Sequence, residues 1–160
     1  MVARCTLDAG MWRIAGEYGE KAGKGDSLLL GRELVLAAYR REAVPRVPWV
    51  PFTGVHAAAL AGYGATEALL DLEKLVRSAL VAYDLYKPDG QPVCFDLQVE
   101  AEILGCQLRW ADDAPPSVSS HPLAERGYDA LGDMRVPVAG DGRLPVILAA
   151  TAFRLPPRTR

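Results

Sequence analysis

The sequence lacks a marked excess of charge of either sign. Its 160 residues include 18 Lys and Arg against 20 Asp and Glu, a formal net charge of −2 at pH 7. Proteins that bind nucleic acid through its phosphates usually present a basic patch or stripe, and this balance gives no sign of one. We therefore expect no nucleic-acid partner.

Cysteines and long apolar runs are also scarce. The three cysteines, Cys5, Cys94 and Cys106, are odd in number and form no CxxC pair, which favours buried thiols in a reducing compartment over disulfides or zinc. A membrane-spanning helix needs roughly 18 apolar residues, and the nearest approach is PVILAATAF, residues 145–153. The N-terminus has no uninterrupted apolar core of a secretory signal. We expect a cytoplasmic protein without membrane contact.

Helices are indicated by apolar spacing and by capping residues. An apolar face repeats at helical spacing from Leu72 to Tyr83, after a capping residue at Thr66 or Asp71. Further helices are predicted at 31–42, 55–60, 98–105 and 145–154.

Short apolar runs between these helices predict buried strands at 47–52 and 91–95, and a third extended piece at 106–110. Residues 111–122 are predicted to be a loop. Strands that alternate with amphipathic helices indicate βαβ units with parallel pairing. In such folds the functional site lies beyond the carboxyl ends of the strands.

Polar residues stand at both of these strand ends. Asp96 follows the second predicted strand, and Thr53 to His56 follow the first. Two segments therefore direct polar groups to one face of the predicted sheet, which favours a site there. The alternative is that Asp96 only caps the next helix, since Asp is a preferred N-cap residue.

Several stretches, in order, resemble the N-terminal half of the uroporphyrinogen decarboxylase family, which also includes the methylcobalamin:coenzyme M methyltransferases. They are GRELVLAAYRREAVPRVPWVPF, HAAALAGYGATEALLD, YDLYKPDGQPVCFDLQVEAEILGC, PPSVSSHPL and DGRLPVILAAT. The resemblance implies an α/β fold, a partial (β/α)8 TIM barrel comprising its N-terminal half. A complete barrel takes about 250 residues, so we expect a truncated form. The expected division is a weakly structured arm at 1–28, the half-barrel at 29–154 and a disordered tail at 155–160.

For the decarboxylase branch, the resemblance implies removal of carboxyl groups from the acetate arms of uroporphyrinogen, in porphyrin biosynthesis, with no cofactor. Asp96 matches the family aspartate that holds the pyrrole N–H groups and is expected to be the catalytic residue. Thr53, His56 and Glu100 are expected to bind substrate. These decarboxylases carry an arginine-rich RQAGRY motif after the first strand, whereas this chain has PFTGVHAAALAGY. Its substrate clamp would then be missing.

The methyltransferase branch is the alternative, because the acidic pair Glu100 and Glu102 is closer to it. Residues at i and i+2 do not share a helix face, so at most one of the two points at the site. That branch binds zinc through the C-terminal half, and this chain has no HxC or comparable ligand set. The two histidines and two of the cysteines have no spacing that supports a metal site, so we expect neither a metal nor a cofactor; these residues are His56, His121, Cys94 and Cys106.

A further alternative is a non-catalytic half-barrel that acts only by association. An open barrel leaves an apolar sheet edge and an uncovered inner face, so self-association is expected. The expected partners are otherwise a small-molecule substrate, either a tetrapyrrole or a corrinoid-linked methyl donor.

Overall fold

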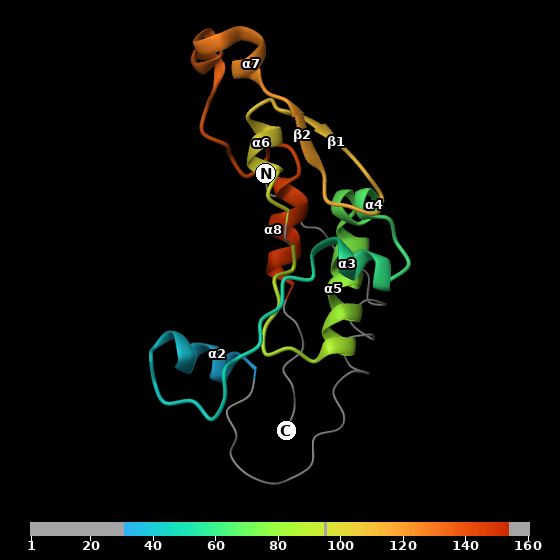
Figure 1. Ribbon diagram of the computed structural model, residues 1–160, viewed down its shortest axis with the longest axis vertical. Helices are drawn as coiled ribbons and strands as arrows, with labels where there is room; N and C mark the ends of the chain where they lie inside the picture. Colours follow the sequence, from blue (N-terminus) through green and yellow to red (C-terminus); the bar gives the residue numbers. More distant parts are fainter. Residues whose placement is uncertain (1–30, 95, 154–160) are drawn as a thin grey trace.

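The computed structural model describes residues 31–94 and 96–153, so the predicted arm and tail lie outside the described residues. Helices dominate this part of the chain, with one short pair of strands (Figure 1). The elements in order are α2 (Arg32–Tyr39), α3 (Gly54–Leu60), α4 (Ala65–Leu70), α5 (Leu72–Tyr86), α6 (Val99–Ile103), β1 (Gln107–Arg109), β2 (Ser117–Ser120), α7 (Pro122–Arg126), the 3-10 helix η1 (Gly127–Asp133) and α8 (Leu144–Ala152).

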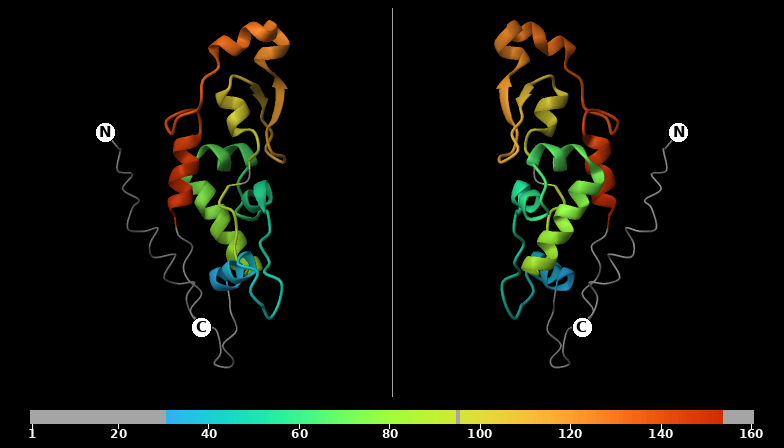
Figure 2. Two further views of the ribbon diagram at one scale, coloured as in Figure 1. Left: turned by 90° about the vertical axis from the view of Figure 1, so that its left-hand side faces the viewer. Right: turned by 90° about the vertical axis from the view of Figure 1, so that its right-hand side faces the viewer.

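The molecule is elongated, with α2 at one end and α7 and η1 at the other (Figure 2). The other helices lie between these ends, and α8 packs beside α5. Among the described residues, no helix combines the length and the apolar character that crossing a bilayer requires.

Helix α5 confirms the prediction from apolar spacing. Its buried residues include Leu75, Val76, Ala79 and Leu80, which repeat at helical intervals. The side chain of Asp71 caps the helix by accepting a hydrogen bond from the Lys74 amide at 3.0 Å. The helix ends where Lys87 adopts a left-handed conformation, directly before Pro88.

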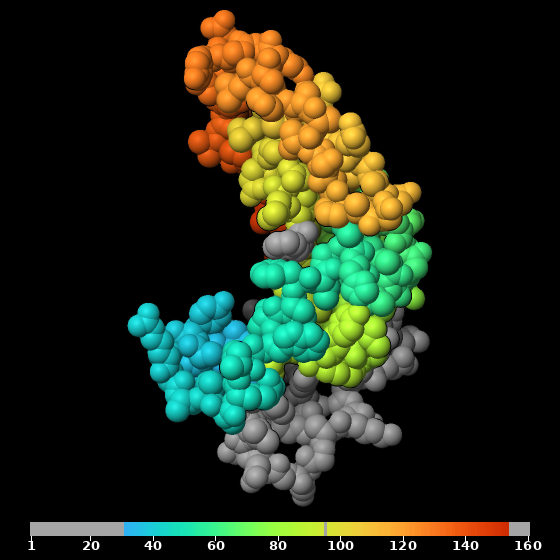
Figure 3. Space-filling model, in the orientation of Figure 1, coloured from blue at the N-terminus to red at the C-terminus, as the bar shows by residue number. Residues whose placement is uncertain are grey.

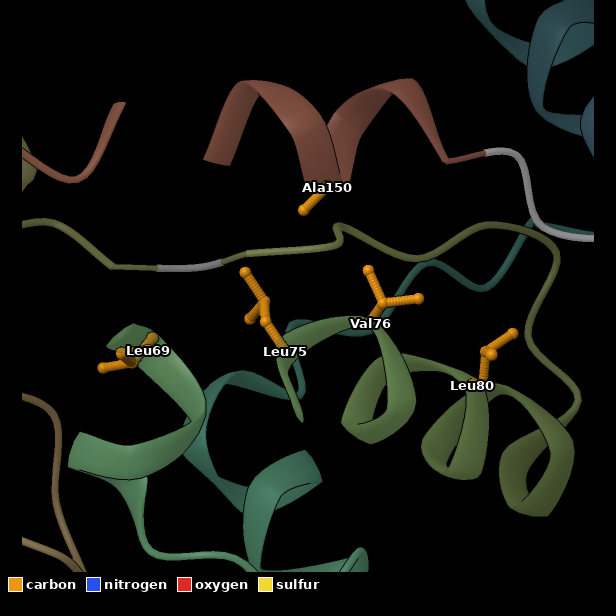
Figure 4. Packing of buried hydrophobic residues seen from close by; sticks show 5 residues of the cluster. All are labelled: Leu69, Leu75, Val76, Leu80 and Ala150. Carbon is orange, nitrogen blue, oxygen red and sulfur yellow. The ribbon is translucent and has the colours of Figure 1, made fainter. Parts of the chain in front are cut away.

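The main apolar core lies between α4, α5 and α8. Its buried residues are Leu69, Leu75, Val76, Leu80 and Ala150 (Figure 4). The extended stretch 91–94 passes between α5 and α8, where Val93 and Cys94 pack against this cluster. Each large side chain buried here contributes about 1.5–3 kcal/mol, so the core holds the stretch leading to Asp96 in place.

The structure corrects the two predicted buried strands. Stretches 47–52 and 91–94 are extended but form no strand, and 47–52 is largely exposed. Phe95 lies outside the described residues. The two stretches run in the same direction, because Val50 approaches Gly90 while residues 53–55 and 92–94 line one cavity.

Pro51 explains why the two stretches do not form a ladder of backbone hydrogen bonds. The Asp89 amide donates to the Trp49 carbonyl at 2.9 Å, which is one rung of a parallel pair. The next donor on the first stretch would be residue 51, and Pro51 has no N–H. The described residues therefore contain no parallel sheet, and the partial barrel stays a prediction.

The strands that do form are β1 and β2, which pair antiparallel as a hairpin. Leu108 lies opposite Val118, and Arg109 opposite Ser117. The extended piece predicted at 106–110 is confirmed as β1, but the predicted loop at 111–122 is wrong at β2. Three of the four residues of β2 are serines, which are not among the residues enriched in strands, so its pairing with β1 rather than local preference forms the strand.

Candidate functional site

The Asp96 carboxylate is buried at the entrance to α6. Its Oδ1 accepts a hydrogen bond from the Gln98 amide at 2.9 Å, and its Oδ2 accepts one from Arg143 Nη1 at 2.5 Å. Only 1% of the side chain is exposed. The carboxylate thus holds the turn before α6, but the N-cap residue of the helix is Gln98, so the alternative that Asp96 caps it is wrong. The same carboxylate also pairs with a cation from a distant part of the chain.

Arg143 is the centre of this cluster, which we call the Arg143 cluster: Arg143, Asp96, Glu102 and Trp110. Its Nε donates to Glu102 Oε2 at 2.7 Å, and its guanidinium lies 4.8 Å from the centre of the Trp110 ring. Burial lowers the pKa of Arg143, but the bonds to Glu102 and Asp96 outweigh this and hold it above its ordinary value. The guanidinium is therefore a permanent cation between two carboxylates.

Local sequence explains how Arg143 is placed. Gly142 has a φ of +48°, a conformation that glycine adopts readily, and it turns the chain into α8 directly before the arginine. Only 6% of the arginine side chain is exposed. No local signal would have revealed its burial, because Asp96 is 47 positions away.

The two acidic residues of α6, Glu100 and Glu102, point in different directions, as the helix geometry requires. Glu102 turns inward to Arg143, whereas Glu100 is exposed. The structure thus places Glu102 in the cluster and leaves Glu100, the residue expected to bind substrate, on the solvent side of α6.

Thr53 lines a small cavity between α3, α4 and α5. Pro92, Val93 and Cys94 line the other side, and the free space is about 20 Å³, enough for roughly one water molecule. Burial raises the pKa of the Cys94 thiol, and the nearby negative charge of Asp96 raises it further. This cavity joins the two predicted strand ends, but it is too small for a substrate in this form.

His56 lies in an exposed aromatic group rather than in the Arg143 cluster. Its Nε2 is 2.6 Å from the Tyr86 hydroxyl, and the two rings stack with centroids 5.9 Å apart. Trp49 meets the same tyrosine edge-on at 6.3 Å. His56 therefore ties α3 to the end of α5.

A second ion pair lies at the start of the 47–52 stretch near α2, with the Asp89 side chain buried and the Arg46 side chain 44% exposed. Asp89 accepts two hydrogen bonds from Arg46, each 2.6 Å long, and others from the Trp49 and Gly31 amides. The Arg46 bonds, opposed in part by burial and aided by the two amides, lower the pKa of Asp89 to about 2. Asp89 thus anchors the 47–52 stretch, and no prediction from the sequence identified this role.

The potential metal ligands do not assemble. Within 31–94 and 96–153, no group of three or more His, Cys, Asp or Glu side chains could hold a metal ion. His121 caps α7 by accepting the Ala124 amide on its Nδ1 at 3.1 Å. The described residues therefore do not fit the zinc site of the methyltransferase branch, and no chemical step of this chain is derived through it.

Comparison with known proteins shows which family this chain resembles. The family model described as uroporphyrinogen decarboxylase (URO-D) matches residues 30–154. A methylcobamide:CoM methyltransferase, MtbA, of Methanosarcina mazei is 29% identical over 123 residues, which are 74% of this chain and 36% of that protein.

A solved structure of a methyltransferase from Methanosarcina mazei superposes with a TM-score of 0.57 at 28% identity, again over 74% of this chain and 36% of the other. This chain thus spans about a third of the length of these relatives. Both the family and the structural likeness imply a TIM-barrel-type fold. The chain belongs to the uroporphyrinogen decarboxylase (URO-D) family.

Proposed function

We propose that this chain forms the Asp96-bearing part of a URO-D family catalytic barrel, and that the enzyme transfers a methyl group from a corrinoid to a thiol. The observation that carries the proposal is the composition of residues 53–61, the entrance and body of α3, which contain no arginine. The similarity to the Methanosarcina methyltransferases supports the same branch.

The arginines near the two extended stretches also support this choice. Arg46 is held by both oxygens of Asp89, and Arg143 by Asp96 and Glu102. Each is already paired with carboxylates of its own chain, and Nη2 of Arg143 is a buried group that the described residues leave without a hydrogen-bond partner. A porphyrinogen with eight carboxylates needs such clamps, whereas a methyl group on a corrinoid does not.

In this proposal the Asp96–Arg143 pair acts as a positioning device. It fixes the entrance of α6 to the start of α8, two segments that face the predicted strand ends. Group transfer depends on reactants held at the correct distance and orientation, and small displacements of the supporting residues lower the rate. Asp96 is therefore proposed to act through the loop it holds, since its own oxygens are buried.

Decarboxylation of a porphyrinogen is the second candidate. The resemblance matches Asp96 to the family aspartate that stabilises the protonated pyrrole, and a fixed carboxylate facing a developing cation suits that reaction. In the present arrangement both oxygens are already bonded, so this function requires the Arg143 cluster to open. A non-catalytic half-barrel is the third candidate.

The test is a reconstitution with two substrates. The 160-residue chain is mixed with the part of the Methanosarcina methyltransferase outside the matched region, and that part alone is the control. Methyl transfer breaks the Co–C bond, forms an S–C bond, releases the thiol proton and leaves the bonding electrons on cobalt as cob(I)alamin. We expect the mixture to consume methylcobalamin in the presence of coenzyme M and to leave uroporphyrinogen unchanged. Decarboxylation of uroporphyrinogen would contradict the proposal, and a stable but inactive complex would favour the third candidate.

A further inference from the structure

A cavity lies between the end of α6 and the segment formed by α7 and η1. This segment is one end of the molecule, and Figure 3 shows it in orange at the top. The cavity has a free volume of about 330 Å³, whereas the cavity beside Thr53 has about 20 Å³. Pockets that bind small molecules usually measure about 300–1,000 Å³, so this space can hold one. It shares no lining residue with the Arg143 cluster.

Part of the cavity lining is apolar. It includes side chains from the end of α6 and from the region of η1, namely Ile103, Leu104, Ala130 and Met134. Ala130 is fully buried, although its neighbours in the chain are exposed. Covering this apolar wall with the apolar part of a ligand removes both surfaces from water, which is favourable.

The rest of the lining carries two cations and two anions. Arg126 and Arg135 are the cations, and Glu125 and Asp133 are the anions. Because the four formal charges cancel, the cavity favours neither a net anion nor a net cation. A ligand that carries one charge of each sign matches it better.

Both signs keep hydrogen-bonding capacity for such a ligand. Arg126 donates to Asp133 through Nη1 at 2.5 Å, and its guanidinium makes no other hydrogen bond to a described residue. Glu125 accepts the Ser120 hydroxyl on Oε1, and its Oε2 has no hydrogen-bond partner in the same part of the chain. The Arg126–Asp133 pair is exposed, and exposed ion pairs are weak enough for a ligand to replace them.

We propose that this cavity, which we call the α6–α7 pocket, binds a zwitterionic α-amino acid with an aliphatic side chain. The ligand carboxylate accepts hydrogen bonds from the Arg126 guanidinium, whose parallel donors match a carboxylate. The ligand ammonium donates to Glu125, and the aliphatic side chain lies against Ile103 and Met134. A ligand with a single charge leaves the opposite charge of the pocket unmatched. The inference goes beyond the proposed function and does not depend on it.

The test measures binding of L-leucine to the intact 160-residue chain by titration calorimetry. Two analogues of similar shape separate the charges, because leucinamide lacks the carboxylate and 4-methylpentanoate lacks the ammonium group. Arg126→Gln and Glu125→Gln each remove one charge of the pocket. Arg77→Gln and Glu73→Gln are the matched controls, since both residues are exposed on α5 and do not line the pocket. Thermal melts show that each variant is folded, and hydrogen exchange reports the order of residues 122–135.

We expect L-leucine to bind at one site per chain and to slow hydrogen exchange in residues 122–135, because the ligand joins α7 to α6. Each analogue, and each of Arg126→Gln and Glu125→Gln, should weaken binding about tenfold or more, whereas Arg77→Gln and Glu73→Gln should change the affinity less than about twofold. If Arg126→Gln fails to fold, the comparison of Glu125→Gln with Glu73→Gln decides.

Three results would overturn the inference. The first is no saturable binding of L-leucine at about 10 mM. The second is an affinity for either analogue equal to that for L-leucine. The third is a loss of affinity in the control variants as large as in the pocket variants.

Discussion

Replacing Arg143 with methionine is the perturbation that the Arg143 cluster predicts most sharply. Methionine is apolar and of similar length, so the change removes the charge but keeps much of the side chain. It leaves the carboxylate of Asp96, whose side chain is 1% exposed, without its cation. Removing one partner of a buried ion pair costs about 3–5 kcal/mol, and loss of the Trp110 contact adds about 0.5–2 kcal/mol. The stability of a domain is about 5–15 kcal/mol, so this single change is expected to remove a large share of it.

Urea denaturation followed by circular dichroism measures the effect. At a typical slope, the expected loss lowers the unfolding midpoint by roughly 2 M. The double variant Asp96→Asn with Arg143→Met removes the unpaired charge, so it should be more stable than Arg143→Met alone. Arg135→Met is the control, because Arg135 also makes two hydrogen bonds to carboxylate oxygens, both of Asp141, but its side chain is 64% exposed and its loss should matter little. An Arg143→Met variant as stable as Arg135→Met, or a double variant with strictly additive losses, would refute this reasoning.

Three further perturbations have defined outcomes. The pKa of Asp89 is about 2 in the fold against 3.8 unfolded, so its contribution is complete above about pH 3.8 and is lost as the pH falls through about 2. The difference in the free energy of unfolding between the native chain and Asp89→Asn should therefore shrink by about 2 kcal/mol over that range. A difference independent of pH would contradict the low pKa of Asp89. Gly142→Ala forces a side chain into a φ of +48° with its Cβ 3.0 Å from Ile103 Cγ1, so chemical denaturation should show a loss of about 1–2 kcal/mol. The raised pKa of the Cys94 thiol predicts alkylation by iodoacetamide at pH 8 about tenfold slower in the folded chain than in denaturant, and equal rates would show the thiol to be accessible.

Five helices, α2, α3, α5, α6 and α8, could be predicted from the sequence because their signals are local, whereas the short α4, α7 and η1 were not predicted. Apolar spacing and the Asp71 cap define α5, and Pro145 in the first turn marks the start of α8. The two predicted buried strands were wrong, because a strand forms only where a neighbouring strand completes its ladder of backbone hydrogen bonds. Pro51 removes one donor from that ladder, and the 47–52 stretch stays exposed.

The candidate site was predictable only in part. The position of Asp96 after an extended stretch pointed to a special role, and helix geometry limited the pair Glu100 and Glu102 to one inward residue. The partner of both Asp96 and Glu102 is Arg143, about 40 positions along the chain, and contacts at that separation leave no trace in local patterns. Thr53 and His56 follow the same extended stretch, but the structure directs them to different neighbours.

The most direct test of the account compares Asp96→Asn with Asp89→Asn in the reconstituted assembly. Both aspartate side chains are almost completely buried and both pair with an arginine, but the Arg46 side chain is 44% exposed whereas the Arg143 side chain is 6% exposed. If the Asp96–Arg143 pair positions the catalytic face, Asp96→Asn should lower kcat for methyl transfer by about 10- to 100-fold at temperatures where the chain is folded. Asp89→Asn should lower the melting temperature and leave kcat within about twofold, because its role is to anchor the 47–52 stretch. Equal effects of the two substitutions on kcat would contradict the account, since Asp96 would then act only through stability.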